Sequence, residues 1–233
     1  MIKLILLMFS MTFTSVYAHH DAPSETRESV LKKSIIRILH ASIPTSGTAF
    51  SVEYKGKVFT ITNAHVCDPV KKDFMVYKKD KKFYKVKVIR VSKYHDICVL
   101  GKIPHLKPLK IRSNISAEEH VYTMGYPLTQ YSVFQEGIYK GLLFNQMKYP
   151  EQSAKLCKSR DYLDIEYDVR GNFCVLSGIF MVTTLTIDAG ASGSPVINSN
   201  GEVVGIISLS IGNMSMGLAV PSNYLVKTLE ELI

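Results

Sequence analysis

The chain lacks a hydrophobic run long enough to cross a bilayer, a Cys-x-x-Cys pair and a Gly-x-Ser-x-Gly motif. A membrane-spanning helix needs about 20 apolar residues, and the apolar run LILLMFSMTF at residues 4–13 is much shorter. Zinc sites commonly draw on cysteine pairs at the missing spacing, so we expect no metal and no cofactor. The missing serine motif argues against an α/β hydrolase.

The first residues have the pattern of an export signal. A positive start at Lys3 precedes the apolar run, and SVYA follows it with small residues at Val16 and Ala18. This order predicts a signal peptide over residues 1–18, cut after Ala18. We therefore expect a periplasmic or secreted protein with no membrane anchor after cleavage. The polar segment at residues 19–33 is predicted to be flexible, with room for a short helix.

Composition favours strands over helices in a globular chain. The 233 residues are 46% hydrophobic and 21% charged, and include 13 Tyr and 10 Phe. Aromatic and β-branched residues are enriched in strands. Short segments of this kind recur between turn signals, and one helix, capped by Ser222 or Asn223, is predicted to close the chain. Many strands with one terminal helix predict packed barrels or a sandwich. The predicted strands include SIIRILHA, TAFSVEY, KVFTITN, KVKVIRVS, DICVLGK, HVYTMGYP, SVFQEGIYKGLLF, GIFMVTTLTI, SPVIN, GEVVGIISLS and MGLAVPS.

A formal net charge of +8 is concentrated in one segment, Lys71–Arg90. Such a segment either attracts a polyanion, such as nucleic acid or an anionic membrane surface, or is a hairpin whose lysines are simply solvated. Lysines also protect exposed strand edges from pairing. The aromatic residues there alternate as strand positions do, so we expect the solvated hairpin and no nucleic-acid partner. Polyanion binding remains the alternative.

Four cysteines are spaced far apart in the sequence. Cys157 and Cys174 bracket a polar stretch, and in an exported protein disulfides are permitted. We therefore predict a disulfide between them that closes this stretch as a loop. Cys67 and Cys98 either pair with each other or are small buried thiols.

Three residues of complementary chemistry lie at predicted strand boundaries. His65 follows a strand in TITNAHV, Asp96 precedes one in HDICVL, and Ser192 lies in the glycine-flanked turn DAGASGSPV. Acyl transfer needs an alcohol within reach of an imidazole, and a carboxylate that fixes the imidazole's tautomer. The order His, Asp, Ser is that of the chymotrypsin type and differs from the subtilisin and α/β-hydrolase orders.

The chain resembles the trypsin-like serine proteases, and within them the HtrA/Deg type. The matching pieces occur in family order from about residue 33 to the end: SGTAFSV, TNAHV, HDICVLGK, YTMGYP, FQEGIYKG, GASGSPVINSNGEVVGI and MGLAVPSNYL. The resemblance implies an all-β fold of two perpendicular six-stranded barrels with a C-terminal helix and an active site between the barrels. It divides the protease domain, 34–233, into barrels at about 34–112 and 118–222 and a helix at 223–233.

The resemblance also implies the role of each site residue. Ser192 is the nucleophile, His65 the general base and Asp96 its partner, while the backbone N–H groups of Gly190 and Ser192 form the oxyanion hole. Polypeptides are the expected substrates. One departure is Ser194, which replaces a glycine of the family pattern. A second is that no segment for a peptide-binding PDZ domain follows the terminal helix, so regulation through such a domain is not assumed.

The resemblance further places a specificity pocket. It implies a floor at Thr186, a wall at Ser208, Leu209 and Ser210, and Gly217 on the facing segment. Thr186 supplies no carboxylate for a buried Lys or Arg, so we expect cleavage after small or medium apolar residues.

Two other functional classes remain as alternatives to an exported serine endopeptidase. One is a catalytically silent barrel protein that binds peptides. The other is a polyanion-binding module that uses the basic first barrel.

Overall fold

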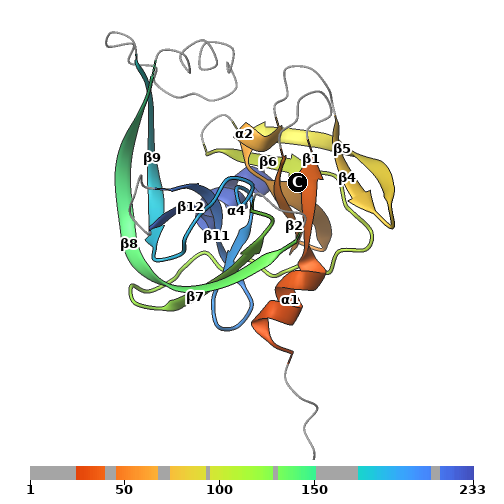
Figure 1. Ribbon diagram of the computed structural model, residues 1–233, viewed down its shortest axis with the longest axis horizontal. Helices are drawn as coiled ribbons and strands as arrows, with labels where there is room; N and C mark the ends of the chain where they lie inside the picture. The colour runs from red at the N-terminus through yellow and green to blue at the C-terminus, as the bar shows by residue number, and fades with distance from the viewer. Residues whose placement is uncertain are drawn as a thin grey trace, which may run out of the picture.

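Two closed barrels of antiparallel strands form most of the chain (Figure 1). The computed structural model describes residues 25–39, 46–67, 74–92, 95–127, 131–150, 173–210 and 216–233, with only the backbone at 145–150 and 173–178. The prediction of two six-stranded barrels followed by a C-terminal helix is confirmed. The predicted signal peptide lies outside the described residues.

The first barrel closes in the strand order β1–β2–β3–β6–β5–β4. Lys55 and Gly56 connect β2 to β3, and their positive φ angles of 47° and 75° are those of a two-residue hairpin turn. The predicted basic hairpin is β4 with β5, and its inward residues Met75 and Val86 join the buried core of this barrel. The strands are β1 (Ile35–Leu39), β2 (Ser46–Tyr54), β3 (Lys57–Thr62), β4 (Phe74–Lys79), β5 (Lys82–Ser92) and β6 (Ile97–Leu100).

The second barrel closes in the order β10–β11–β12–β9–β8–β7. Its strands are β7 (His120–Gly125), β8 (Val133–Pro150), β9 (Phe173–Thr183), β10 (Pro195–Ile197), β11 (Val203–Ser210) and β12 (Gly217–Pro221). Strands β8 and β9 continue beyond the barrel as a long two-stranded ribbon (Figure 1).

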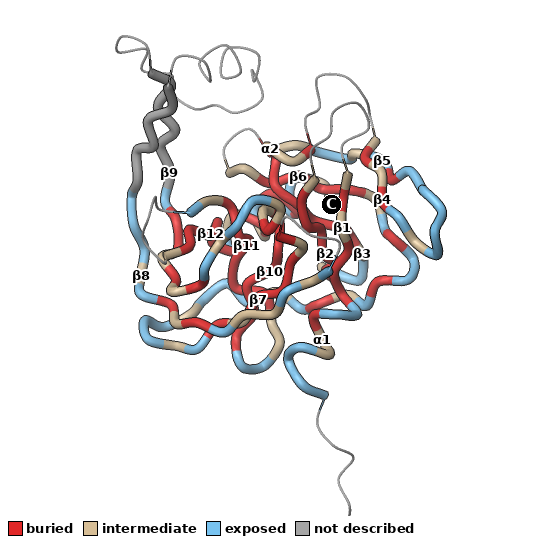
Figure 2. Tube along the Cα trace, viewed as in Figure 1, coloured by how far each residue is buried: buried red, intermediate tan, exposed pale blue. Residues whose placement is uncertain are grey.

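A shared hydrophobic core joins the two barrels. It packs Phe50 and Ile61 of the first barrel with Ile197 and Ile206 of the second. Figure 2 shows this buried interior in red within both barrels. Because close-packed interiors resist sliding, this core fixes the barrels relative to each other, and with them the residues at their junction.

Two helices cover the ends of the shared core. Helix α1 (Arg27–Ser34) lies within the segment predicted to be polar and flexible, and its fully buried Leu31 joins that core. Thr26 caps it by accepting the N–H of Ser29 at 3.2 Å. Among the described residues, no helix is long and apolar enough to span a membrane.

Helix α4 (Ser222–Glu230) is the predicted terminal helix, but the predicted cap is wrong. Its N-cap residue is Pro221, which provides no side-chain hydrogen bond. The hydroxyl of Ser222 instead donates to the carbonyl of Arg112 at 2.6 Å. The cap was misjudged because this tertiary contact competes for the serine hydroxyl.

Candidate active site

His65 lies in a short helix, α2 (Ala64–Cys67), which begins just after β3. The backbone carbonyl of Asn63 accepts the N–H groups of Val66 and Cys67, both at 3.2 Å. The chain therefore turns sharply at the end of a buried strand. This turn presents the imidazole at the edge of the first barrel.

Strand pairing brings Asp96 to His65. Strands β3 and β6 are antiparallel, with Thr62 opposite Cys98. Residues just after Thr62 therefore lie near those just before Cys98, and Asp96 is among them. The side chain of Asn63 donates to the backbone carbonyl of Asp96 at 3.1 Å, which holds the turn before β6 in place.

The Asp96 carboxylate is bound from three directions. His65 Nδ1 lies 3.0 Å from Oδ1 and 2.9 Å from Oδ2, and the backbone N–H of His65 donates to Oδ1 at 3.0 Å. The hydroxyl of Ser208 donates to Oδ2 at 2.6 Å. Burial is the largest single influence and raises the pKa of Asp96, but attraction to His65 and these hydrogen bonds together hold the pKa below its ordinary value. The carboxylate is therefore charged at neutral pH.

A disulfide joins the two segments that carry His65 and Asp96. Cys67 and Cys98 are bonded, with their Cα atoms 6.3 Å apart. Each cysteine lies two residues after its functional neighbour in the chain. Of the two readings left open by the sequence, pairing is the one observed, and it links α2 covalently to β6.

The loop between β9 and β10 carries Ser192. Gly193 has a φ of +85°, and a Cβ atom there would lie 2.1 Å from the backbone oxygen of Thr48 and 2.4 Å from the hydroxyl of Thr62. Only glycine fits so close to β2 and β3. This close approach seats the loop against the first barrel, so residues of both barrels meet at one place.

The backbone before Ser192 forms a tight turn with two unused donors. The N–H of Ala191 donates to the carbonyl of Asp188 at 3.0 Å, and Gly190 has a φ of +96°. Gly190 is the third residue of this four-residue turn, where a positive φ is characteristic of a type II turn. Among the described residues, no acceptor binds the N–H groups of Gly190 and Ser192. These are the two groups predicted to form the oxyanion hole.

Thr48 of β2 braces this turn. Its hydroxyl donates to the carbonyl of Gly190 at 3.0 Å and accepts the backbone N–H of Tyr126 at 3.0 Å. Its own N–H donates to the carbonyl of Ser192 at 2.8 Å. Sequence reasoning did not single out Thr48, although it lies within the matching piece SGTAFSV. One threonine thus ties the loop to both barrels.

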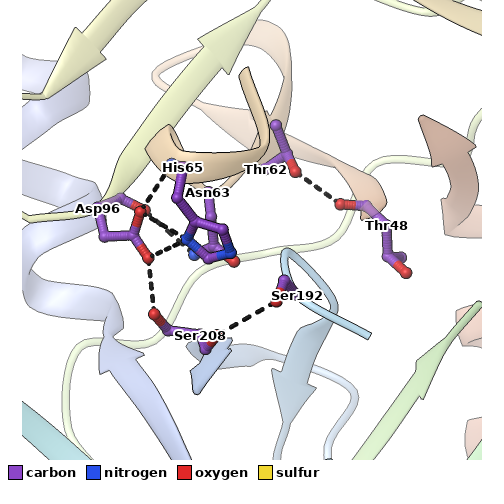
Figure 3. Close-up of polar contacts among 7 residues, drawn as sticks. All are labelled: Thr48, Thr62, Asn63, His65, Asp96, Ser192 and Ser208. Carbon is purple, nitrogen blue, oxygen red and sulfur yellow. Dashed lines mark hydrogen bonds and ion pairs between the residues drawn. The ribbon is translucent and has the colours of Figure 1, made fainter. Parts of the chain in front are cut away.

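In Figure 3, Ser192 is seen on the side of His65 that faces away from Asp96, with its hydroxyl directed to Ser208. Its recorded hydrogen bond is to the carbonyl of Ser208, at 3.2 Å. Ser208 therefore contacts two of the three predicted residues: its hydroxyl donates to Asp96, and its carbonyl accepts the hydroxyl of Ser192. The three predicted residues come together, and Ser208 joins them although it was predicted only as a pocket wall.

Comparison with known proteins identifies the family. The model of the trypsin-like peptidase domain matches residues 46–206. This chain belongs to the trypsin-like peptidase family. The match includes His65, Asp96 and Ser192, so the resemblance read from the sequence is confirmed.

The trypsin-like chain is similar to several HtrA-type proteins. It is 27% identical over 183 residues to a "Serine protease HtrA-like" of Staphylococcus epidermidis, which covers 75% of this chain and 28% of that protein. It is 26% identical over 220 residues to "Serine protease HTRA1" of Xenopus laevis, covering 91% of this chain and 42% of that protein. The chain thus spans less than half the length of these relatives.

Solved structures share the fold. The active form of the Rv3671c protease from M. tuberculosis superposes with a TM-score of 0.66 at 19% identity, covering 97% of this chain and 93% of that one. The serine endoprotease from Yersinia pestis superposes with a TM-score of 0.61 at 19% identity, covering 91% and 68%. These likenesses support the two-barrel fold.

The departure at Ser194 is accommodated inside the trypsin-like fold. Its buried hydroxyl donates to the carbonyl of Ala191 at 2.6 Å. A Cβ atom on Gly125 would lie only 2.1 Å from that hydroxyl. The glycine of the segment YTMGYP therefore leaves the room that the serine occupies, and the loop keeps its shape.

The residues predicted to line the specificity pocket lie on two paired strands, β11 and β12, and on the loop after β9. Strand pairing sets Ser210 opposite Gly217 and Leu209 opposite Leu218. Thr186 is exposed, and its backbone N–H donates to the side chain of Gln135.

The side chain of Ile187 packs closely against Gly217, because an added Cβ on this glycine would lie 2.3 Å from Ile187 Cδ1. Sequence reasoning missed Ile187 because it placed the pocket floor by counting back from Ser192. The pocket assignment and its preference for apolar residues remain predictions.

Two further predictions concern cysteines and metals. Cys157 and the side chain of Cys174 lie outside the described residues, so their disulfide stays a prediction. Within the described ranges, no group of three His, Cys, Asp or Glu side chains is arranged to hold a metal. His95, next to Asp96, stacks on Tyr224 of α4 with ring centroids 3.9 Å apart.

Proposed function

We propose that this chain is an exported serine endopeptidase that hydrolyses peptide bonds through Ser192, His65 and Asp96. The observation that carries the proposal is the contact network in which Asp96 binds both His65 and Ser208, and Ser208 binds Ser192, in a member of a peptidase family. Polypeptides are the proposed substrates. Export rests on the signal-peptide pattern of residues 1–18.

The first half-reaction forms an acyl-enzyme. Asp96 holds Nδ1 of His65, which leaves Nε2 as the nitrogen that takes a proton. The Ser192 hydroxyl rotates from the Ser208 carbonyl toward Nε2, loses its proton there and attacks the scissile carbonyl carbon. The oxygen that becomes negative is bound by the N–H groups of Gly190 and Ser192. The imidazolium then protonates the leaving amine as the C–N bond breaks.

The second half-reaction releases the acid product. Water gives a proton to Nε2 of His65 and attacks the acyl carbon, and the same two N–H groups bind the oxyanion again. The proton then passes to Ser192 as the acyl–oxygen bond breaks. Asp96 remains ionised throughout and stabilises the imidazolium in both halves.

A fluorophosphonate probe and casein hydrolysis test the proposal. The parent protein should be labelled at Ser192, whereas Ser192→Ala and His65→Ala should each lose nearly all labelling or turnover, because nucleophile and base act as a unit. Asp96→Asn should reduce kcat about 10⁴-fold, since the imidazole then adopts the wrong tautomer.

Ser113→Ala is the matched control, because Ser113 is an exposed serine outside the site. It should keep the parent rate. Casein cleavage by Ser192→Ala at the parent rate would refute the mechanism. A folded parent protein that is neither labelled nor active would instead support the catalytically silent, peptide-binding alternative.

A further inference from the structure

The hairpin of β4 and β5 presents a face that combines lysines with apolar side chains. Cross-strand pairs set Phe74 opposite Lys87, Val76 opposite Lys85, and Lys78 opposite Phe83. The alternate residues Met75, Tyr77 and Val86 are buried in the barrel, so these pairs point outward. We call this surface the basic face: Phe74, Val76, Lys78, Phe83, Lys85 and Lys87.

Two large apolar side chains at the outer part of the hairpin are exposed to solvent. Phe83 is 64% exposed, and Ile89, just beyond the basic face, is 45% exposed. The hairpin lies on the opposite side of the molecule from the β8–β9 ribbon, and its outer part is drawn as exposed in Figure 2. Exposed apolar patches that are rimmed by polar residues mark sites of interaction with proteins or membranes.

The positive charge of the hairpin is not neutralised within the described chain. Six lysines have no carboxylate partner among the described residues: Lys78, Lys79, Lys81, Lys82, Lys85 and Lys87. Arg90 differs, because Glu231 binds it. Lys85 Nζ lies 4.4 Å from the ring centre of Phe74, and Lys78 Nζ lies 5.7 Å from that of Phe83. Lysine heads and aromatic rings therefore occupy one layer.

We propose that the basic face docks on an anionic lipid bilayer. A bilayer surface offers an anionic plane for the lysines and an apolar layer beneath it for Phe83 and Ile89. The phosphates of a nucleic acid would match the lysines, but a duplex offers no apolar layer for the exposed side chains of Phe83 and Ile89. Docking would hold the protein at a membrane surface, whatever the activity of Ser192.

Vesicle cosedimentation tests the charge requirement. The full chain carrying Ser192→Ala, which prevents self-digestion, is mixed with vesicles of phosphatidylcholine alone or with about 30% phosphatidylglycerol. Binding is expected only to the phosphatidylglycerol vesicles, and it should weaken strongly between about 0.05 M and about 0.5 M NaCl. Equal binding to both vesicle types, or to neither, would overturn the proposal.

Two triple variants with the same change in net charge test the location. K78Q/K85Q/K87Q removes the lysines of the basic face, and K57Q/K110Q/K140Q removes three exposed lysines elsewhere. Each lysine near an anionic surface raises the partition coefficient about fivefold, so the first variant should bind roughly a hundredfold more weakly. The second should change binding only a few-fold. Equal losses in the two variants would reject the basic face as the site.

Phe83 tests the apolar part of the proposal. The chain contains no tryptophan, so Phe83→Trp introduces a single fluorescent reporter. Its emission should shift to the blue on phosphatidylglycerol vesicles and be quenched by brominated lipid, and Phe83→Ser should weaken binding. An unshifted emission overturns insertion. Equally tight binding of an oligonucleotide that does not depend on Phe83 would assign the surface to nucleic acid instead.

Discussion

At the residue scale, Ser208 and Thr48 each bind two separate parts of the candidate site. Ser208 binds Asp96 with its hydroxyl and Ser192 with its carbonyl, so one residue of β11 contacts the carboxylate and the nucleophile. Thr48 holds the turn before Ser192: its hydroxyl donates to the carbonyl of Gly190 and accepts the backbone N–H of Tyr126. A buried polar group that loses its partner costs about 1–3 kcal/mol. A substitution of Ser208 or Thr48 should therefore change the geometry of the candidate site.

Thr48→Val should lower kcat about tenfold with little change in KM. The variant keeps the shape of the side chain but removes the bond that orients the Gly190 carbonyl, so the oxyanion donors lose part of their alignment; losing one such donor outright costs about 10²–10³-fold. Thr48→Ser retains the hydroxyl and should recover most of the rate. Steady-state kinetics on one peptide substrate measures both. Equal impairment of the Ser and Val variants would show that packing, and not the hydroxyl, matters.

At the element scale, α2 and β6 are joined three times. Strand β6 pairs with β3 just before α2, His65 binds Asp96, and the Cys67–Cys98 disulfide closes the connection. The first two contacts are non-covalent and depend on the turns at the strand ends. The disulfide limits how far the two segments can separate when those turns fluctuate. It therefore restricts the positions that His65 can take relative to Asp96.

Replacing both cysteines, Cys67→Ala with Cys98→Ala, should destabilise the protein and slow catalysis. The bond spans a sequence separation of 31, for which the chain-entropy model gives roughly 3–4 kcal/mol. Urea unfolding of the parent and the variant measures the loss. An unchanged unfolding midpoint in the variant would contradict the expectation.

At the scale of the whole molecule, two carboxylates hold separate parts of the chain together. Asp96 lies where the barrels meet and binds Ser208 of the second barrel. Glu25 precedes α1 and pairs with Lys33 at 2.6 Å and with Lys107, in the connection between the barrels, at 3.0 Å. Hydrogen bonds to Lys33 and Lys107 lower the pKa of Glu25 to about 2. Both pKa values lie below the ordinary value of the group, so both carboxylates are charged in the folded protein at neutral and mildly acid pH.

Acid should therefore destabilise the fold through these two groups. A folded-state pKa below the unfolded value gives stability that is complete above the unfolded pKa, near 4, and is lost as the pH falls through the folded value. The fall in Tm between about pH 6 and about pH 3 should be smaller in Asp96→Asn and in Glu25→Gln than in the parent. Glu28→Gln is the control, since Glu28 has no ion pair among the described residues. If Tm fell with pH as steeply in both test variants as in the parent, these two carboxylates would not be the origin of the acid sensitivity.

Local sequence determined the elements and the residues of the candidate site. Alternating apolar residues and turn signals such as Lys55-Gly56 place strands correctly because side-chain direction in a strand has a period of two. His65, Asp96 and Ser192 were predicted as site residues because each lies at a strand boundary within a segment that resembles the trypsin-like proteases. The cap of α4 was misread because the hydroxyl of Ser222 binds Arg112, a residue 110 positions away.

The tertiary structure decided everything that depends on segments distant in the chain. Pairing of β3 with β6 selected the Cys67–Cys98 disulfide from two readings that the sequence left open. Closure of the barrels brought Ser208 to Asp96 and Thr48 to Gly190, contacts that span 112 and 142 residues of sequence. No local pattern predicts such contacts, because a hydroxyl forms a hydrogen bond with any suitable polar group that tertiary packing places within about 3 Å. The sequence therefore determined which residues have the chemistry, and packing of the two barrels decided which of them meet.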